Sequence, residues 1–328
     1  MTESIFPNLR MRRLRQSAFI RDLVQEQRLH SSDLIWPLFV CEGENITEDV
    51  ASMPDVKRYS VDRIVELART ATELHIPAIA LFPKTPEKLK DAAGSEALND
   101  QNLVCQAVRA IKAACPELGI VCDVALDPYT DHGHDGILKK KEILNDETIK
   151  ILVDQSLLQA QMGCDVLAPS DMMDGRIGEI RKALDNNGFK MTQILSYAVK
   201  YASSFYGPFR DAVGTKGLLK SSKKNYQMDF KNSNEALREV ALDIKEGADM
   251  VMVKPGLPYL DIIKLVKENF KIPVMAYQVS GEYSLLENGI KKGLTNNDIV
   301  IESLIAFKRA GANAIVSYYA DRLDTILK

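Results

Sequence analysis

The chain has 328 residues, of which 46% are hydrophobic, a formal net charge of −3 and a sequence pI of about 5.9. This length and apolar content suit one large α/β domain or two smaller ones. The near-neutral charge and the lack of a nucleic-acid-binding motif exclude nucleic acid as an expected partner. No apolar run reaches the roughly 18 residues that span a bilayer, so no membrane partner is expected either.

The cysteines and the first residues indicate the compartment. The five cysteines lie far apart and include no C-x-x-C pair, which favours reduced thiols; they are Cys41, Cys105, Cys115, Cys122 and Cys164. The first seven residues lack the apolar core of a signal peptide. We therefore expect a cytoplasmic protein.

Residues 1–32 differ from the rest of the chain because residues 9–15 are basic and no strand is predicted. A frayed terminus is one interpretation. However, the segment carries several apolar side chains, which are Ile5, Phe6, Leu9, Met11 and Leu14. We interpret it as an arm that docks on a neighbouring subunit, followed by a catalytic domain at 33–328.

From residue 33, short apolar runs alternate with amphipathic segments. The runs predict eight strands buried on both faces, at 34–40, 78–82, 120–126, 166–169, 193–198, 250–253, 274–279 and 314–319. The segments between them predict helices, at 61–74, 102–114, 148–162, 234–245, 260–269 and 297–309. Ser233 and Asn297 are expected helix N-caps.

A short motif recurs where a helix is expected to end and a strand to begin. Its three copies are Gly163-Cys-Asp165, Gly247-Ala-Asp249 and Gly311-Ala-Asn313. Glycine at a helix C-terminus favours the left-handed cap, so the motif indicates repeated helix–strand units and a parallel sheet. Eight strands favour a (β/α)8 barrel. An open doubly wound sheet is the alternative, but no G-x-G-x-x-G follows the first strand.

Polar side chains gather at the carboxyl ends of the predicted strands, where barrel chemistry is found. They are Asp123, Asp127, Ser170, Asp171, Lys200, Lys254, Gln278, Ser280 and Tyr318. Lys254 ends an apolar run, so desolvation should lower its pKa and leave an amine able to form a Schiff base. A lysine reaching out to solvent is the alternative. Lys200 ends the preceding strand, and repulsion between the two ammonium groups should lower at least one pKa further.

Three loops beyond the strand ends also carry candidate groups. Residues 123–136 hold four aspartates and two histidines, which predicts either a lid or a magnesium site. In the loop at 203–210, Arg210 could hold a carboxylate or form an ordinary surface ion pair. Lys216, Lys220, Lys223 and Lys224 are either a solvated face or a loop that pairs with an acidic substrate.

These residues stand in segments that resemble the porphobilinogen synthase (5-aminolevulinic acid dehydratase) family over essentially the whole chain. The segments are 169–176, 200–210, 226–228, 252–255 and 277–283. The resemblance implies a TIM barrel with an N-terminal arm, usually assembled into octamers. It also implies the condensation of two 5-aminolevulinate molecules to porphobilinogen and two waters, for heme or chlorophyll synthesis.

The resemblance assigns roles to single residues. Lys254 would bind the first substrate as a Schiff base, and Lys200 the second. Ser280 and Tyr318 match the residues that bind the carboxylate of the first substrate molecule. The residues that bind the carboxylate of the second molecule are matched by Arg210, Lys223 and Gln227. Lys223 stands where many members have arginine, so it would act as a point charge. Asp123 and Ser170 match polar residues that hydrogen-bond substrate.

The resemblance also bears on metals. Zinc-dependent members carry three cysteines where this chain has Ala125, Asp127 and Asp135, which excludes a thiolate zinc site there. The chain resembles the aspartate-rich, magnesium-responsive branch, with Asp127 and Asp135 as a candidate lid site for a metal. The pattern of the allosteric Mg²⁺ site is matched by Arg10, Asp174, Glu239 and Asp243, with Glu239 as ligand through waters. A solvated helix face is the alternative for Glu239 and Asp243.

Two other functions stay open on the residues alone. One is a class I aldolase, which needs a single Schiff-base lysine. The other is a barrel without catalytic activity that serves in binding or assembly.

Overall fold

Eight parallel strands close into a barrel in the computed structural model, which describes residues 7–215, 217–219 and 222–327. The strands follow chain order around the barrel, and the last pairs with the first. They are β1 (Leu34–Val40), β4 (Ala78–Pro83), β5 (Gly119–Val124), β8 (Val166–Pro169), β9 (Gln193–Lys200), β10 (Met250–Lys254), β11 (Val274–Tyr277) and β12 (Ala314–Val316). The predicted barrel and its eight strands are therefore confirmed.

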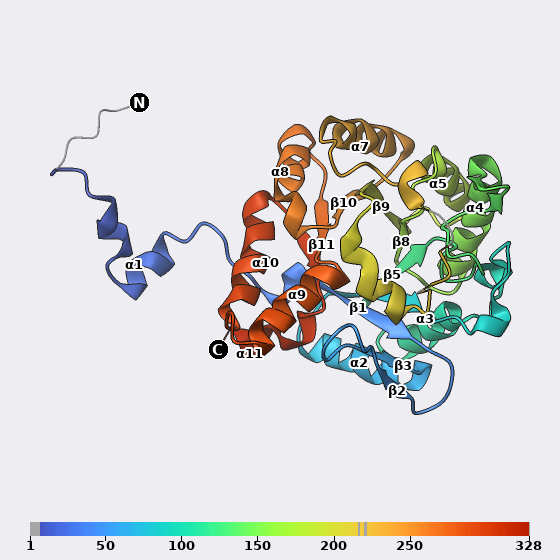
Figure 1. The fold of residues 1–328 in the computed structure, drawn as a ribbon, viewed down its shortest axis with the longest axis horizontal. Coiled ribbons are helices and arrows are strands. Elements are labelled where there is room, and N and C mark those ends of the chain that lie inside the picture. Colours follow the sequence, from blue (N-terminus) through green and yellow to red (C-terminus); the bar gives the residue numbers. More distant parts are fainter. Residues whose placement is uncertain (1–6, 216, 220–221, 328) are drawn as a thin grey trace.

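Helices surround the barrel (Figure 1). The six predicted from amphipathic segments are α2 (Val61–Glu73), α3 (Leu103–Ala114), α4 (Asn145–Gln161), α7 (Asn234–Glu246), α8 (Leu260–Asn269) and α10 (Asp298–Ala310). The others are α5 (Arg176–Asn186), α6 (Gly207–Ala212), α9 (Ser280–Lys291) and α11 (Leu323–Ile326). Ser233 and Asn297 do stand at the N-cap positions of α7 and α10, but neither side chain makes a capping hydrogen bond.

Short elements decorate the barrel. The pair β2 (Thr47–Asp49) and β3 (Lys57–Tyr59) extends the sheet beside β1, and β6 (Leu138–Lys139) pairs with β7 (Glu142–Ile143). The 3-10 helices are η1 (Met11–Arg15), η2 (Ser31–Asp33), η3 (Glu87–Leu89), η4 (Ser95–Leu98), η5 (Ser204–Tyr206), η6 (Lys223–Asn225), η7 (Leu257–Tyr259) and η8 (Ala320–Arg322). Of these, η5 and η7 follow the two strands that end in lysine.

The recurring Gly-x-Asp/Asn motif fixes the amino-terminal end of the barrel. Its glycines adopt φ values between +101° and +112°, as the predicted left-handed caps require. The third residue of each copy then accepts a hydrogen bond from the backbone N–H near the start of the preceding strand. These bonds join Asp165 to Ile120 (2.8 Å), Asp249 to Ile194 (2.7 Å) and Asn313 to Val274 (3.1 Å). One device therefore sets the register of three strand pairs.

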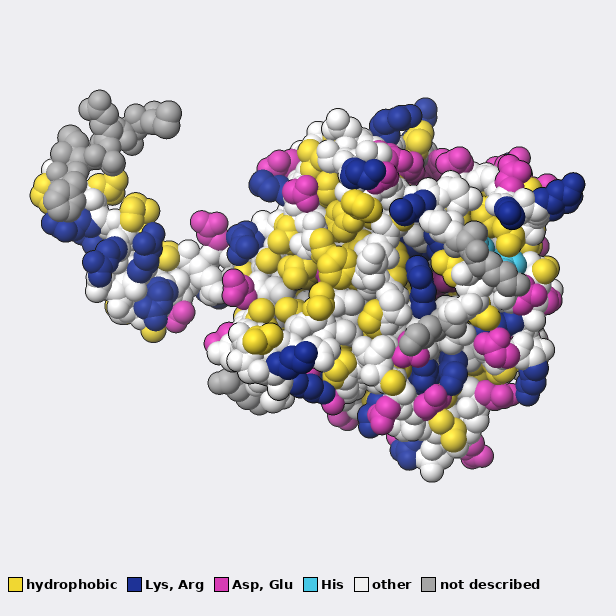
Figure 2. All heavy atoms as spheres, viewed as in Figure 1, with side chains coloured by type: hydrophobic (Ala, Val, Ile, Leu, Met, Phe, Trp, Pro, Cys, Tyr) yellow, Lys and Arg dark blue, Asp and Glu magenta, His cyan; other side chains and the backbone are white. Residues whose placement is uncertain are grey.

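The arm projects away from the barrel (Figure 1). It contains η1 and α1 (Ala18–Leu23), and its apolar side chains are exposed, with Phe19 68% and Leu23 73% accessible. Leu9, Met11 and Leu14 are exposed as well, whereas Ile5 and Phe6 lie outside the described residues. Basic side chains gather on the arm, and hydrophobic side chains cover part of the nearby barrel face (Figure 2). Among the described helices, none is long and apolar enough to cross a membrane.

Candidate active site

Predicted site residues from four strand ends and the loops beyond them line one inner cavity of about 40 Å³ at the carboxyl end of the barrel. They are Asp123, Asp127, Ser170, Lys200, Arg210, Lys223, Gln227 and Lys254. Arg210, Lys223 and Gln227 also line an outer cavity of about 500 Å³. The inner cavity thus adjoins a wider vestibule. Five of the residues predicted at the strand ends converge on the inner cavity, whereas four others do not line it, namely Asp171, Gln278, Ser280 and Tyr318.

The two lysines of the cavity stand side by side. Lys254 and Lys200 are paired residues of β10 and β9, and each is less than a tenth exposed. Burial, and then the nearby charge of Lys200, lower the pKa of Lys254 to about 7. A substantial fraction of this amine is therefore unprotonated at neutral pH and can attack a carbonyl.

Four aromatic rings surround the Lys254 amine. Its Nζ lies 4.5 Å from the ring centroid of Tyr277, 4.9 Å from Tyr197, 5.2 Å from Phe209 and 5.7 Å from Tyr206. Ring faces attract cations at such distances. The same rings also exclude water, and the lowered pKa indicates that this desolvation prevails over the attraction. The rings would surround an iminium formed on Nζ in the same way.

Asp135 connects the aspartate-rich loop at 123–136 to two lysines of the cavity, Lys200 and Lys223. Its carboxylate lies 3.2 Å from Nζ of Lys200 and 2.7 Å from Nζ of Lys223, and it accepts a 2.7 Å hydrogen bond from the Tyr226 hydroxyl. Although burial raises the pKa of Asp135, Lys200 and Lys223 hold it well below its usual range. Lys223 also pairs with Asp127 at 3.3 Å. The loop therefore borders the cavity and is held to it by ion pairs with Lys200 and Lys223.

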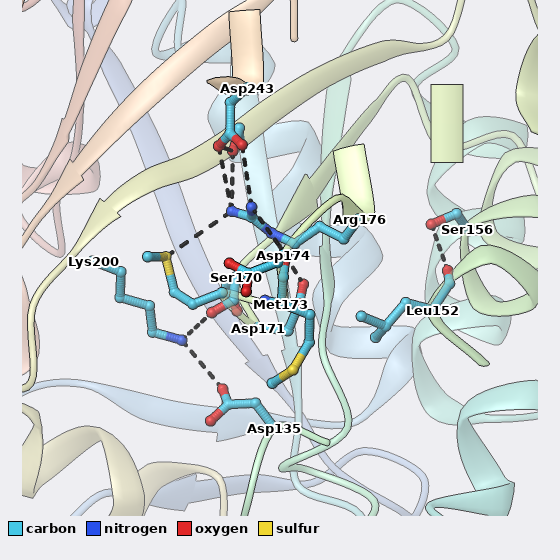
Figure 3. A network of polar contacts seen from close by, with 12 residues as sticks. Asp135, Leu152, Ser156, Ser170, Asp171, Met173, Asp174, Arg176, Lys200 and Asp243 are labelled. Atoms are coloured by element: carbon cyan, nitrogen blue, oxygen red, sulfur yellow. Dashed lines mark hydrogen bonds and ion pairs between the residues drawn. The ribbon is translucent and has the colours of Figure 1, made fainter. Parts of the chain in front are cut away.

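Figure 3 shows the contacts of Lys200 from the side. Besides pairing with Asp135, its Nζ donates to the backbone carbonyl of Ser170. Asp123 lines the cavity with them, and burial, followed by the charge of Asp127, raises the pKa of Asp123 to about 6. Within the described part of the chain its Oδ1 has no hydrogen-bond partner. A carboxyl group of this kind can carry protons near neutral pH.

A separate cavity of about 430 Å³, here called the acidic cavity, is lined by the side chains of Asp174, Asp229, Glu235 and Glu239. Burial, and then Asp243, raise the pKa of Glu239. Asp243 itself is 2% exposed and pairs with the buried Arg176 at 3.2 Å (Figure 3), so a solvated helix face is the wrong interpretation for it. Tyr226 and Gln227 form part of the cavity wall as well.

Comparison with known proteins identifies the family. The family model described as "Delta-aminolevulinic acid dehydratase" matches residues 8–326. The chain belongs to this family. It is 56% identical over 315 residues to the delta-aminolevulinic acid dehydratase of Bradyrhizobium diazoefficiens, covering 96% of this chain and 89% of the relative. It is 48% identical to the delta-aminolevulinic acid dehydratase of Rhodobacter capsulatus, and this match covers 96% of this chain and 95% of that relative.

A solved structure agrees with this assignment. The delta-aminolevulinic acid dehydratase (porphobilinogen synthase) of Toxoplasma gondii ME49, crystallised with the reaction product porphobilinogen, matches with a TM-score of 0.94 and 45% identity. The match covers 97% of this chain and 91% of that one. This chain is therefore an enzyme, a hydro-lyase of the delta-aminolevulinic acid dehydratase family.

Delta-aminolevulinic acid dehydratases depend on metals in general, so we tested whether the acidic residues fit an ion. Within residues 7–215, 217–219 and 222–327, no three His, Cys, Asp or Glu side chains are grouped closely enough to hold one. Asp127 and Asp135 already have lysine partners, so a metal there would have to displace ammonium groups. The acidic cavity instead offers carboxylates around open space, the oxygen ligands by which one or two side chains would hold a hydrated divalent cation.

Two residues matched to carboxylate binding in delta-aminolevulinic acid dehydratases, Ser280 and Tyr318, lie just outside the inner cavity. The Ser280 hydroxyl accepts from the N–H of Phe209 (2.9 Å) and donates to the carbonyl of Phe205 (3.3 Å). The Tyr318 hydroxyl lies 3.2 Å from that of Tyr277. Both thus contact residues next to Lys254, but neither lines the space between the two lysines.

The cationic residues fall into two groups. Among the described residues, Arg210 has no ion-pair partner, so the surface ion pair considered from its sequence is not observed. Lys223, by contrast, is paired with two aspartates, and these raise its pKa although burial opposes them. Lys224 is exposed, and Lys216 and Lys220 lie outside the described residues. Arg10 lies on the arm and does not line the acidic cavity of its own chain.

Proposed function

We propose that this chain is a porphobilinogen synthase that condenses two 5-aminolevulinate molecules through imines on Lys254 and Lys200. The observation that carries the proposal is the pair of buried lysines at paired positions of β9 and β10. Each substrate molecule has a ketone, which an amine can attack. Holding both molecules on neighbouring strands makes the condensation nearly intramolecular.

The first imine forms on Lys254. Its unprotonated Nζ attacks the ketone carbon to give a carbinolamine, which loses water to become an iminium. Asp123, with its pKa near 6, is placed to give a proton to the departing hydroxyl and to take one back later. The rings of Tyr277 and Tyr197 lie against the resulting positive charge.

The second molecule reacts at Lys200, whose Nζ must first leave its contact with Asp135. Arg210 and Gln227 line both cavities and are available to hold its carboxylate, with Lys223 as an additional charge. Ser280 and Tyr318 would hold the first carboxylate after turning from their present partners. Over the cycle the two molecules lose two waters and form porphobilinogen.

Borohydride trapping tests this function. Reduction in the presence of limiting 5-aminolevulinate should give an adduct on Lys254, and saturating substrate should add one on Lys200, as read by peptide mass mapping. K254Q and K200Q should each lose their own adduct, and K264Q, an exposed lysine on α8, should behave like the wild type. Trapping with a sugar phosphate but not with 5-aminolevulinate would favour an aldolase. Failure to form the chromogenic pyrrole with any divalent metal would favour a non-catalytic barrel.

We also propose that Mg²⁺ regulates the enzyme from the acidic cavity. Glu239 and Asp174 would hold the hydrated ion, whose charge offsets the crowded carboxylates. Tyr226 and Gln227 support regulation because they line this cavity, while Tyr226 bonds Asp135 and Gln227 lines the inner cavity. Asp243 would support the site through Arg176, and Arg10 would come from another subunit. The candidate lid site at Asp127 and Asp135 stays a prediction, and no step is assigned to it.

We further propose a cytoplasmic homo-oligomer, an octamer, assembled through the arm at 1–32. The exposed apolar residues of the arm support this. Burying side chains such as Phe19 and Leu23 against another copy of the chain would remove apolar surface from water and stabilise the assembly. Five free cysteines agree with a reducing compartment. Neither nucleic acid nor a membrane is among the proposed partners.

A further inference from the structure

We infer that Glu282 is a positioning residue that holds the strand end of Lys254 in the geometry needed for imine formation. The inference rests on the proposed function, because it concerns the same lysine. Glu282 lies in the first turn of α9 and is 2% exposed. It lines none of the three cavities described above.

The carboxylate of Glu282 binds the loop that directly follows Lys254. Its Oε1 accepts from the backbone N–H of Leu257, and its Oε2 accepts from those of Gly256 (3.4 Å) and Val279 (2.6 Å). Gly256 and Leu257 are only two and three residues beyond Lys254. One side chain thus joins the end of β10 to the start of α9.

The chemistry of the carboxylate suits this task. Within the described residues Glu282 has no cationic partner, and its three contacts are all backbone donors. Burial raises the pKa of Glu282 to about 8, although its three backbone N–H donors oppose this rise because they favour the charged form. The fold therefore keeps a buried carboxyl group where a small apolar side chain would leave three donors unsatisfied.

The same turn of α9 also binds the loop after the other lysine strand. Two residues before Glu282, the Ser280 hydroxyl bonds both Phe205 and Phe209, which follow β9. The Tyr206 hydroxyl also connects the ends of β9 and β10. Its one proton is shared between the carbonyls of Tyr201 (2.8 Å) and Lys254 (3.2 Å). The first turn of α9 is therefore the common support of both lysine loops, and Glu282 is its connection to Lys254.

The backbone around this connection is closely packed on the sides of Phe307 and Tyr277. A Cβ atom at Gly256 would clash with the ring of Phe307 and lie 2.9 Å from the Tyr277 carbonyl oxygen. Because the loop is closely packed on these sides, loss of the Glu282 contacts should release it mainly toward the side where Glu282 now stands. Such a shift would move Nζ of Lys254 relative to Lys200 and the surrounding rings.

Glu287 provides a matched control on the same helix. It is also a buried glutamate, 6% exposed, but it pairs with Arg322 at 3.3 Å and has no contact with the loop after Lys254. E287Q should therefore lower the melting temperature without changing the chemistry at Lys254. E282Q keeps the shape of Glu282 and one acceptor oxygen, whereas E282A removes all three bonds.

The test compares E282A, E282Q and E287Q in the full chain. We expect kcat to fall about 10- to 100-fold in E282A, the size of effect known for small misplacements of reacting groups, and less in E282Q. With limiting 5-aminolevulinate, the rate of borohydride trapping at Lys254 should fall in step with kcat. Trapping at Lys200 under saturation should change less than twofold, which a general loss of folded protein would not produce.

Several outcomes would overturn the inference. Wild-type trapping rates at Lys254 in both Glu282 variants would do so, as would parallel losses at Lys254 and Lys200. Equal losses of kcat in E282Q and E287Q would indicate a merely structural role. If E282A does not fold, E282Q carries the comparison. Failure of the wild type itself to be trapped by 5-aminolevulinate would instead refute the proposed function, so the two failures are distinguishable.

Discussion

Lys254 and Lys200 are paired residues at the ends of β10 and β9, yet only Lys200 has a carboxylate partner, Asp135 at 3.2 Å, among the described residues. Two chemically identical side chains therefore stand in different electrostatic environments. Lys254, facing rings and a neighbouring ammonium, has its pKa lowered to about 7. The unpaired lysine is therefore the one prepared to act first as a nucleophile.

The rate of imine formation at Lys254 should depend on pH with a midpoint near 7. Because the lowered pKa belongs to an amine, the reactive neutral form predominates above the pKa and is lost below it. We expect trapping by limiting 5-aminolevulinate to slow by about tenfold for each pH unit well below the midpoint. Single-turnover borohydride trapping between pH 5 and 9 measures this. A midpoint near the ordinary lysine value would contradict it.

Replacing Asp135 by asparagine should affect the Lys200 half of the site more than the Lys254 half. D135N leaves the ammonium groups of Lys200 and Lys223 without this carboxylate. Breaking a buried ion pair costs about 3–5 kcal/mol, so the free energy of unfolding should fall by an amount of this order. Asp135 also raises the pKa of Lys254, so the midpoint of the pH profile should shift to lower pH in D135N.

D131N is the matched control for D135N, because Asp131 lies in the same loop but is exposed. Denaturant unfolding, adduct mapping and the pH profile of trapping should distinguish the two variants. Equal effects of D131N and D135N on the Lys200 adduct would show that the loop acts only through its overall charge.

The barrel could be predicted because its strands are apolar on both faces and its glycine caps recur. The helix α9 was missed because its buried face carries Ser280, Glu282, Ser284 and Glu287, which read as polar sequence. Polar burial also weakens the pattern of α4, where Gln155, Ser156 and Gln159 face inward. Hydrophobic periodicity cannot identify a helix face that is buried through hydrogen bonds and ion pairs.

The charged part of the site was predictable for a different reason. Parallel strands bring their carboxyl ends to one rim, so Lys200 and Lys254 had to lie close together. The rings of Tyr197 and Tyr277 were not predicted as site residues, because aromatic residues inside apolar strands read as core. Their distances to Nζ of Lys254 depend on side-chain directions around the barrel, which sequence spacing does not specify.

Magnesium should stimulate porphobilinogen formation through Glu239. We expect EDTA to lower the activity and Mg²⁺ to restore it, whereas E239Q should keep its basal activity and lose the stimulation. E268Q, an exposed glutamate on α8, is the control and should respond like the wild type. Calorimetric titration of the metal-free chain with Mg²⁺ gives a readout independent of activity. Activity unchanged by EDTA, with Zn²⁺ alone restoring metal-stripped enzyme, would contradict the prediction.

Arg176 should contribute more to stability than Arg181, the other arginine of α5. It is 2% exposed and lies 3.2 Å from Asp243 and 3.6 Å from Asp171. R176M would leave both buried carboxylates without their partner, at a cost of about 3–5 kcal/mol. D185N breaks a more exposed pair on the same helix, with Arg181, and should change stability by less than about 0.5 kcal/mol. Denaturant unfolding measures both, and similar losses would contradict the argument.

Removing the arm should change assembly without unfolding the barrel. The arm leaves apolar side chains exposed, so deletion of residues 1–24 should yield a folded barrel in a smaller assembly, as measured by light scattering and circular dichroism. The double variant F19S/L23S should weaken assembly in the same direction because it removes the two most exposed apolar side chains in the described part of the arm. M191S, at a still more exposed site on the barrel, is the control and should assemble normally. If Arg10 supports a magnesium site in another subunit, the deletion should abolish Mg²⁺ stimulation as well. An unchanged assembly in both arm variants would show that the subunits join through the barrel alone.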